Sequence, residues 1–256
     1  LPASTLAQGV TTSAVTGVVK DSSGSIVPGV SVTAVHVPSG TRYESVSDAD
    51  GHFFIPGMRV GGPYTVTAAL QGFSNDERKD IMLSLGATQT IELTLKVASV
   101  TATETVVGKV DPVFAANRTG AATAITRDDL AVLPTVSGRM NDITRTTPQF
   151  GGGGSFAGQD NRLNNITVDG SYFNNSFGLG GQPGDRTGVA PISLEAIEQV
   201  QVSVAPYDVR QGNFVGAGIN TVTRSGTNSY TAAGYSRYRN QSYVGTQAGA
   251  NTFNPG

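Results

Sequence analysis

The stretch Thr90-Ile91-Glu92-Leu93-Thr94-Leu95-Lys96-Val97 decides the fold of the first part of the chain. Its apolar residues occupy every second position, which predicts a strand with one face against a core and the other in solvent. Six more short strands are predicted before it, separated by turns that contain Gly or Pro: 14–20, 30–37, 42–47, 52–55, 64–69 and 81–85. Short strands at this spacing are typical of an all-β sandwich, which we expect over residues 14–97.

The composition of the whole chain narrows the class of protein. Its 256 residues are 38% hydrophobic and 14% charged, as in a folded chain, and the 33 glycines follow no three-residue period, which excludes collagen. Helix formers are sparse, which excludes an all-α bundle. The 17 basic and 19 acidic residues give a net charge of -2, so we expect no nucleic-acid partner.

Residue types that carry much of enzyme chemistry are scarce. There is no cysteine and there are only two histidines, His36 and His52, so disulfides, thiol nucleophiles and histidine-rich metal sites are excluded. No G-x-S-x-G or phosphate-binding G-x-x-x-x-G-K-[ST] motif occurs. Asp48-Ala49-Asp50-Gly51 lacks the later ligands of a calcium loop and is interpreted as a hairpin turn. We therefore expect no catalytic residues, no metal and no cofactor, and predict that the protein is not an enzyme.

The two ends of the chain suggest export and a membrane. Residues 1–13 are interpreted as the remnant of a secretory signal or an N-terminal tail, the alternative being an arbitrary boundary. No run of about 20 apolar residues predicts a membrane-spanning helix. Residues 230–240, at the start of the segment 229–256, alternate aromatic with small or polar residues, as Tyr230, Tyr235 and Tyr238 show. That alternation is typical of a membrane β-barrel strand, the alternative being a soluble edge strand.

Between these parts lie a linker and a mixed α+β segment. Residues 98–119 are mostly Ser, Thr, Ala and Val, and are predicted to be extended. Residues 120–228 contain two short predicted helices, 127–133 and 139–143, and Thr126 with Asp129 forms a capping box for the first. A helical turn at 193–196 and strands at 165–170 and 199–204 are also predicted.

Three consecutive parts of the sequence resemble, in order, the parts of one known family. Residues 14–97 look like a carboxypeptidase regulatory-like (transthyretin-like) domain, and residues 120–228 look like the plug of a TonB-dependent outer-membrane receptor of the Oar-like group. The motifs that carry the resemblance are Gly17–Asp21, Pro28–Val30, Ser47–Phe53, Gly62–Tyr64, Gln71–Phe73, Gln159–Arg162, Asn165–Gly170, Pro191–Val200, Ala205–Gly212 and Gly218–Asn228.

The resemblance implies a fold and a set of partners. The fold is mainly β with α+β: a transthyretin-like β-sandwich, a plug, and in residues 229–256 the first strand or strands of an incomplete β-barrel. Thr103, Glu104, Thr105, Val106 and Val107 resemble the TonB box, a segment that adds as a strand to TonB; the alternative is a plain β-rich linker. The implied partners are TonB with its inner-membrane energising complex, outer-membrane lipid through the barrel, and an unidentified cargo.

The resemblance also implies roles for two groups of residues. Candidates to face a ligand from the plug loops are Gly152, Gly153, Asp160, Asn161, Arg162, Asn174 and Asn175. Candidates for the structural motif of the plug are Asp169, Gly170, Arg210, Gly212, Gly218, Asn220 and Arg224. The same polar residues, with Asn164 and Asn165, have an alternative interpretation as ordinary turn chemistry. The Arg-Gly pair common in siderophore receptors is not evident, which argues against iron-chelate cargo.

Two functions follow from the sequence. The first is TonB-dependent transport at the cell outer membrane, with the plug gating a barrel and residues 14–228 in the periplasm or barrel lumen. The second is a secreted or surface-attached adhesion module that uses the β-sandwich to bind carbohydrate or protein.

Overall fold

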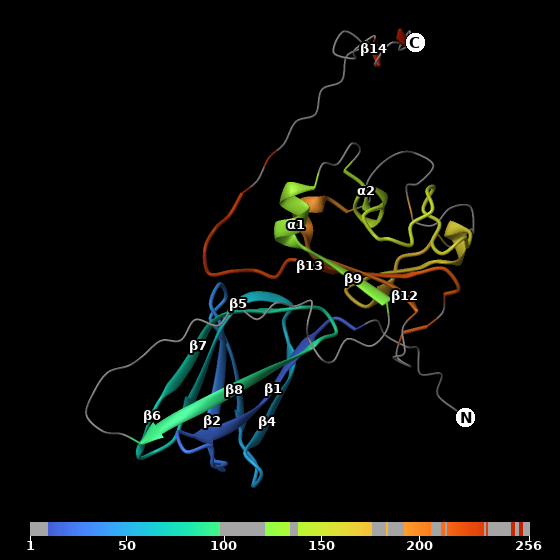
Figure 1. Ribbon diagram of the computed structural model, residues 1–256. Helices are drawn as coiled ribbons and strands as arrows, with labels where there is room; N and C mark the ends of the chain where they lie inside the picture. Colours follow the sequence, from blue (N-terminus) through green and yellow to red (C-terminus); the bar gives the residue numbers. More distant parts are fainter. Residues whose placement is uncertain are drawn as a thin grey trace, which may run out of the picture.

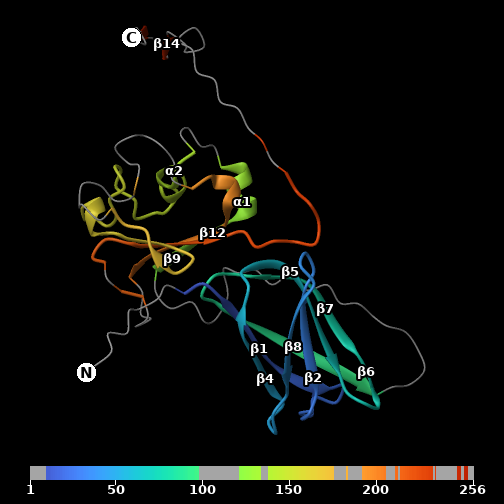
Figure 2. The ribbon, with the colours of Figure 1, turned by 180° about the vertical axis from the view of Figure 1, so that it is seen from behind.

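The computed structural model describes residues 10–97, 121–133, 138–175, 183, 192–205, 211–212, 214–232, 234, 247–248 and 251–252 (Figure 1). This part of the chain is mainly β, with few and short helices. It forms a β-sandwich, residues 13–97, and a second region, the described residues between 121 and 228. The sheet of the second region lies between its helices and one end of the sandwich, as both views show (Figures 1 and 2).

Two four-stranded sheets make the sandwich, in the orders β4-β1-β8-β6 and β3-β2-β5-β7. The strands are β1 (Ser13–Asp21), β2 (Ser31–His36), β3 (Thr41–Val46), β4 (His52–Met58), β5 (Gly61–Ala69), β6 (Phe73–Ser74), β7 (Asp76–Leu83) and β8 (Thr88–Val97). The first and last long strands, β1 and β8, are parallel neighbours, whereas the other pairs are antiparallel. Alternate residues of both sheets fill one apolar core.

The deciding stretch forms β8, and its alternation is confirmed. Ile91, Leu93 and Leu95 are buried, while Val97, at the strand end beside the two-residue β6, is 64% exposed. Gly17 of the neighbouring β1 leaves the space that the ring of Phe53 fills, since a Cβ at Gly17 would lie 2.7 Å from that ring.

One predicted strand of the sandwich is misplaced. The sequence predicts a strand at 81–85, but β7 runs from Asp76 to Leu83. The run of charged residues 76–80 hides the strand because β7 is an edge strand, where charged side chains are favoured. The expected hairpin turn at Asp48 is confirmed, with Asp48 Oδ1 accepting from the backbone N–H groups of Asp50 and His52 at 2.9 Å.

The second region is a five-stranded mixed sheet in the order β11-β10-β13-β12-β9. Its elements are β9 (Ala121–Thr126), α1 (Arg127–Val132), α2 (Met140–Thr144), the 3-10 turn η2 (Asn161–Leu163), β10 (Asn165–Val168), β11 (Ser171–Tyr172), the 3-10 turn η3 (Leu194–Ala196), β12 (Ile197–Ala205) and β13 (Gly218–Thr223). The predicted capping box is confirmed: Thr126 and Asp129 exchange hydrogen bonds at the start of α1. A second apolar cluster lies on one face of this sheet, around Val200, Val202 and Phe156.

The predicted start of a barrel, 229–256, falls largely outside the described residues. What is described there includes two short strands, β14 (Gln247–Ala248) and β15 (Asn251–Thr252), which pair with each other. The described helices are all too short or too polar to span a bilayer.

Candidate functional site

The glycine-rich loop that carries Gly152 and Gly153 is a closed turn. The N–H of Gly151 donates to the carbonyl of Ser155 at 3.0 Å, and the N–H of Ser155 donates back to Gly152 at 3.0 Å. Gly152 and Gly153 have φ values of 83° and 60°, which favour glycine. At the base of the turn, the rings of Phe150 and Phe156 pack edge to face, 5.5 Å apart.

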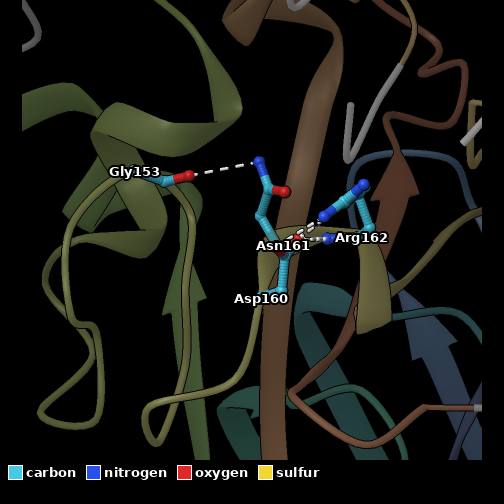
Figure 3. A network of polar contacts seen from close by, with 4 residues as sticks. All are labelled: Gly153, Asp160, Asn161 and Arg162. Atoms are coloured by element: carbon cyan, nitrogen blue, oxygen red, sulfur yellow. Dashed lines mark hydrogen bonds and ion pairs between the residues drawn. The ribbon is translucent and has the colours of Figure 1, made fainter. Parts of the chain in front are cut away.

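Asp160 and Arg162 form an exposed ion pair beside this loop (Figure 3). Arg162 donates through Nε and Nη2 to the two carboxylate oxygens of Asp160, each at 3.0 Å, and its backbone N–H donates at 2.9 Å. These hydrogen bonds from Arg162 lower the pKa of Asp160 to about 2. The pair therefore stays ionised at neutral pH, with the two charges largely compensating each other.

Two asparagines join the turn η2 to the glycine-rich loop. Asn161 donates to the Gly153 carbonyl at 3.2 Å (Figure 3). Asn164, which is buried, donates to the Gly154 carbonyl at 2.7 Å and accepts from the N–H of Ala217 at 2.9 Å. Asn164 therefore connects three segments of the chain.

A second pair of asparagines holds the start of β10. Asn165 donates to the Gly212 carbonyl at 3.2 Å and accepts from Asn174 at 3.2 Å. Asn174 also accepts from the N–H of Ile166 at 2.7 Å. Asn175 follows Asn174 directly in the same loop. The amides of Asn165 and Asn174 are thus engaged in building the loop.

Residues of the predicted structural motif hold the strands of the sheet together. Asp169 and Gly170 have φ values of 48° and 80° and form the tight turn from β10 to β11. Asp169 accepts from the N–H and the hydroxyl of Thr223 at 2.8 and 2.7 Å. Asn220 accepts from the Thr167 hydroxyl at 2.9 Å.

Two more members of this motif lie at the two ends of the central strand β13. Gly218 leaves room for the ring of Phe214, which a Cβ would approach to 2.8 Å. Arg224 donates its backbone N–H to the carbonyl of Ala196 at 2.9 Å. Arg210 and the TonB-box candidate Thr103–Val107 lie outside the described residues.

Asp160, Asn161, Arg162 and Asn164 form a polar rim beside the glycine-rich loop, before the start of β10, rather than a set of converging catalytic groups. Across the described residues there is no group of three or more His, Asp or Glu side chains that would hold a metal ion. Asp160, Arg162 and Asn161 are the exposed members, so a ligand that meets this rim would meet a polar surface with compensated charge.

The histidine of the core has a structural role. His36 is buried, its Nδ1 lies 2.7 Å from the hydroxyl of Ser39, and its ring lies 4.9 Å from that of Tyr64. Burial, and secondarily Arg59, lowers the pKa of His36, and burial raises the pKa of Tyr64. Both side chains are therefore uncharged at neutral pH.

Sequence reasoning missed the contact between the two parts of the molecule. Gln199 of β12 accepts a hydrogen bond from the N–H of Leu85 at 3.1 Å, although the two residues are 114 positions apart. Glu198 beside it is half-buried, and burial raises its pKa, while Arg127 and Arg224 oppose the shift. The alternation of β12 indicates that Gln199 faces away from Val200, but nothing in the sequence names its partner.

Comparison with known proteins identifies the first part of the chain. Residues 14–96 match the family model of the carboxypeptidase regulatory-like domain, so the β-sandwich is a domain of this kind. A search of curated proteins found no match to the chain.

Three of the solved structures that match part of this chain are the following. A cohesin–X-dockerin complex mutant from Acetivibrio cellulolyticus matches at 19% identity over 32% of this chain and 56% of that chain, with a TM-score of 0.26. A putative carbohydrate binding protein from Bacteroides uniformis matches at 17% over 32% and 40%, with a TM-score of 0.27. The minor pilin GBS52 of Streptococcus agalactiae matches at 13% over 38% and 50%, with a TM-score of 0.29. Each match spans less than two thirds of the solved chain.

Proposed function

We propose that this chain belongs to a TonB-dependent transporter of the outer membrane, similar to the Oar-like group. In this proposal residues 120–228 act as the plug that gates a β-barrel, and residues 98–119 carry the segment that engages TonB. The carboxypeptidase regulatory-like domain precedes them on the periplasmic side.

The observation that carries the proposal is the arrangement of the resemblance motifs in the second region. Three separate motifs, Asn165–Gly170, Pro191–Val200 and Gly218–Asn228, contribute β10, β12 and β13. These strands are neighbours in one sheet, in the order β10-β13-β12. Three motifs of the resemblance therefore build one sheet, although they lie far apart in the sequence. They also follow a domain of the kind that the resemblance predicts, and both observations support the proposal.

The mechanism proposed for the chain assigns roles to its own residues. A ligand on the loop side meets Asp160, Asn161 and Arg162, whose hydrogen bonds run into the glycine-rich loop and β10. Displacement of this rim would be passed to the sheet because Asn164 links η2 to the segment before β13. The segment at Glu104 then adds as an extended strand to the edge of a TonB sheet, with main-chain hydrogen bonds supplying affinity.

The test uses a peptide of residues 98–112 and the periplasmic domain of TonB. Isothermal calorimetry should detect binding at peptide concentrations up to about 1 mM, the weak end of specific affinities. The matched control carries Val106→Pro, which removes one main-chain donor and should abolish strand addition. Absence of binding by the unmodified peptide at that concentration would contradict the assignment of the TonB segment.

A second candidate function rests on the family match, which covers only the β-sandwich. In that case the protein is a secreted or surface-attached module that binds carbohydrate or protein. Two results together would favour this function. The peptide of residues 98–112 would not bind TonB, and residues 10–97 would bind to a glycan or protein array.

A further inference from the structure

One end of the β-sandwich faces the sheet of the second region (Figures 1 and 2). The loop between β2 and β3 contributes the carbonyl of Pro38, which accepts from the N–H of Asn228 at 3.0 Å. The loop between β7 and β8 contributes the N–H of Leu85, which donates to Gln199 at 3.1 Å. Residues of two strand connections thus meet β12 and the chain that follows β13.

The face of the sheet that meets the sandwich is polar. Gln199, Gln201 and Ser203 alternate along β12 with Val200 and Val202, so the glutamines and the serine lie on the face away from the apolar cluster. Gln199 is 2% exposed and Ser203 is 4% exposed. On the neighbouring β13, the amide of Asn220 donates to the carbonyl of Val10, in the segment before β1.

Hydrogen bonding across this contact is incomplete. Among the described residues, the Nε2 amide of Gln199 is buried without a hydrogen-bond partner. Leu85 and Val60, 2% and 7% exposed, are buried but belong to neither apolar cluster. A buried donor without a partner destabilises the closed arrangement, and movement of the sandwich away from the sheet would let water bind this amide. Opening of this contact would remove that cost, which favours a reversible contact.

The side chain of Glu198, on β12, lies at this contact and points toward the sandwich. A Cβ at Gly61, the first residue of β5, would lie 2.5 Å from the Glu198 Oε1, so the carboxylate occupies the space that a side chain at 61 would take. Burial raises the pKa of Glu198, with Asp128 adding to the effect. Arg127 on α1 and Arg224 after β13 lower it but do not cancel it.

We propose that the polar face of the five-stranded sheet is a reversible docking surface for the loop end of the β-sandwich, and that protonation of Glu198 tightens the docking. The neutral carboxyl group loses little when the sandwich covers it, whereas the ionised group regains hydration when the sandwich moves away. Because the pKa is higher in the docked state, docking is strongest below the pKa of the free carboxyl group. It weakens as the pH rises through the docked value.

Paramagnetic relaxation in the whole chain tests the proposal. The chain has no cysteine, so Val37→Cys places a single nitroxide label beside Pro38. Val37 is 56% exposed and tolerates a label. Docking predicts that the label broadens the amide signals around Asn228, more at about pH 4.5 than at about pH 8, a range chosen around an ordinary glutamate pKa of about 4.3. A label at Ser23→Cys, in the turn after β1 at the other end of the sandwich, is the matched control and should leave those signals sharp.

Two variants separate docking from its pH dependence. Glu198→Gln should keep the broadening at every pH because the side chain stays neutral. Gln199→Ala should weaken it at every pH by leaving the Leu85 N–H without its acceptor; preserved shift dispersion in both regions shows that the variant is folded. No broadening from Val37→Cys at any pH overturns the docking surface. Broadening that is equal at both pH values, with no effect of Glu198→Gln, overturns the role of Glu198.

Discussion

The β-sandwich and the second region are held together in different ways. The sandwich buries alternate apolar residues of two sheets in one core, and its strands can be traced in the sequence pattern. The second region has a smaller apolar cluster and adds side-chain amides that bond to distant backbone groups, as Asn164 does with Gly154 and Ala217. The spacing of apolar residues in the sequence therefore predicts the strands of the sandwich. It does not predict the polar contacts that hold the second region together.

The largest expected effect comes from the core of the sandwich. Phe53→Ala should destabilise it by about 3–5 kcal/mol, because it removes a buried ring and leaves a cavity. Phe54, the next residue of β4, is 54% exposed whereas Phe53 is 2% exposed, so Phe54→Ala is the matched control. Urea unfolding, monitored by circular dichroism, measures the free energy of unfolding of both variants. An equal loss of stability in the two variants would show that the buried core does not hold the sandwich together.

A smaller but still clear effect is expected in the second region. Asn164→Ala should cost about 1–3 kcal/mol, because it leaves the N–H of Ala217 and the carbonyl of Gly154 without their partner in a buried place. Asn161→Ala removes one exposed hydrogen bond and should cost less than about 1 kcal/mol. The rate of hydrogen exchange at the Ala217 amide measures the difference between the two variants. Unchanged protection in Asn164→Ala would mean that this side chain does not hold the loop.

The smallest effect concerns the exposed ion pair. The carboxyl group of Asp160 should titrate with a pKa of about 2. Carbon-detected NMR of its side-chain carboxyl signal measures this titration. Because this pKa is lowered in the folded chain, the ion pair stabilises the fold above the ordinary Asp pKa of about 3.9. That stabilisation is lost as the pH falls through about 2, where the carboxylate is protonated. In Arg162→Gln the midpoint should move up toward the ordinary value, and an unmoved midpoint would contradict the hydrogen bonds of Figure 3.

Much of the secondary structure could be predicted from local signals. The alternation of 90–97 predicts β8, and the capping pair Thr126 and Asp129 predicts the start of α1. Strand β7 was misplaced because the charged residues of an edge strand carry no apolar period. Apolar alternation reports burial on one face of a strand and a capping pair reports a helix start, but neither signal marks an edge strand whose residues are charged.

The candidate site could be predicted only as a set of polar residues. The sequence groups Asp160, Asn161 and Arg162 as candidates to face a ligand, which stays a prediction. Asn164 and Asn165 bond to backbone groups about 50 positions away. Such partners depend on tertiary structure, so residue type alone does not separate a ligand-facing amide from one that holds a loop. The docking contact of Gln199 was missed for the same reason.

The parallel pairing of β1 with β8 has a mechanical consequence. The register runs from Ala14 opposite Thr88 to Asp21 opposite Leu95, so the two strands are bonded over nearly their full length. A pull on the chain at Val97, opposed by a hold on the chain before Ser13, would load these hydrogen bonds in shear and all together. The sandwich should therefore resist tension along β8 far better than tension that peels an edge strand such as β3 from its sheet one bond at a time.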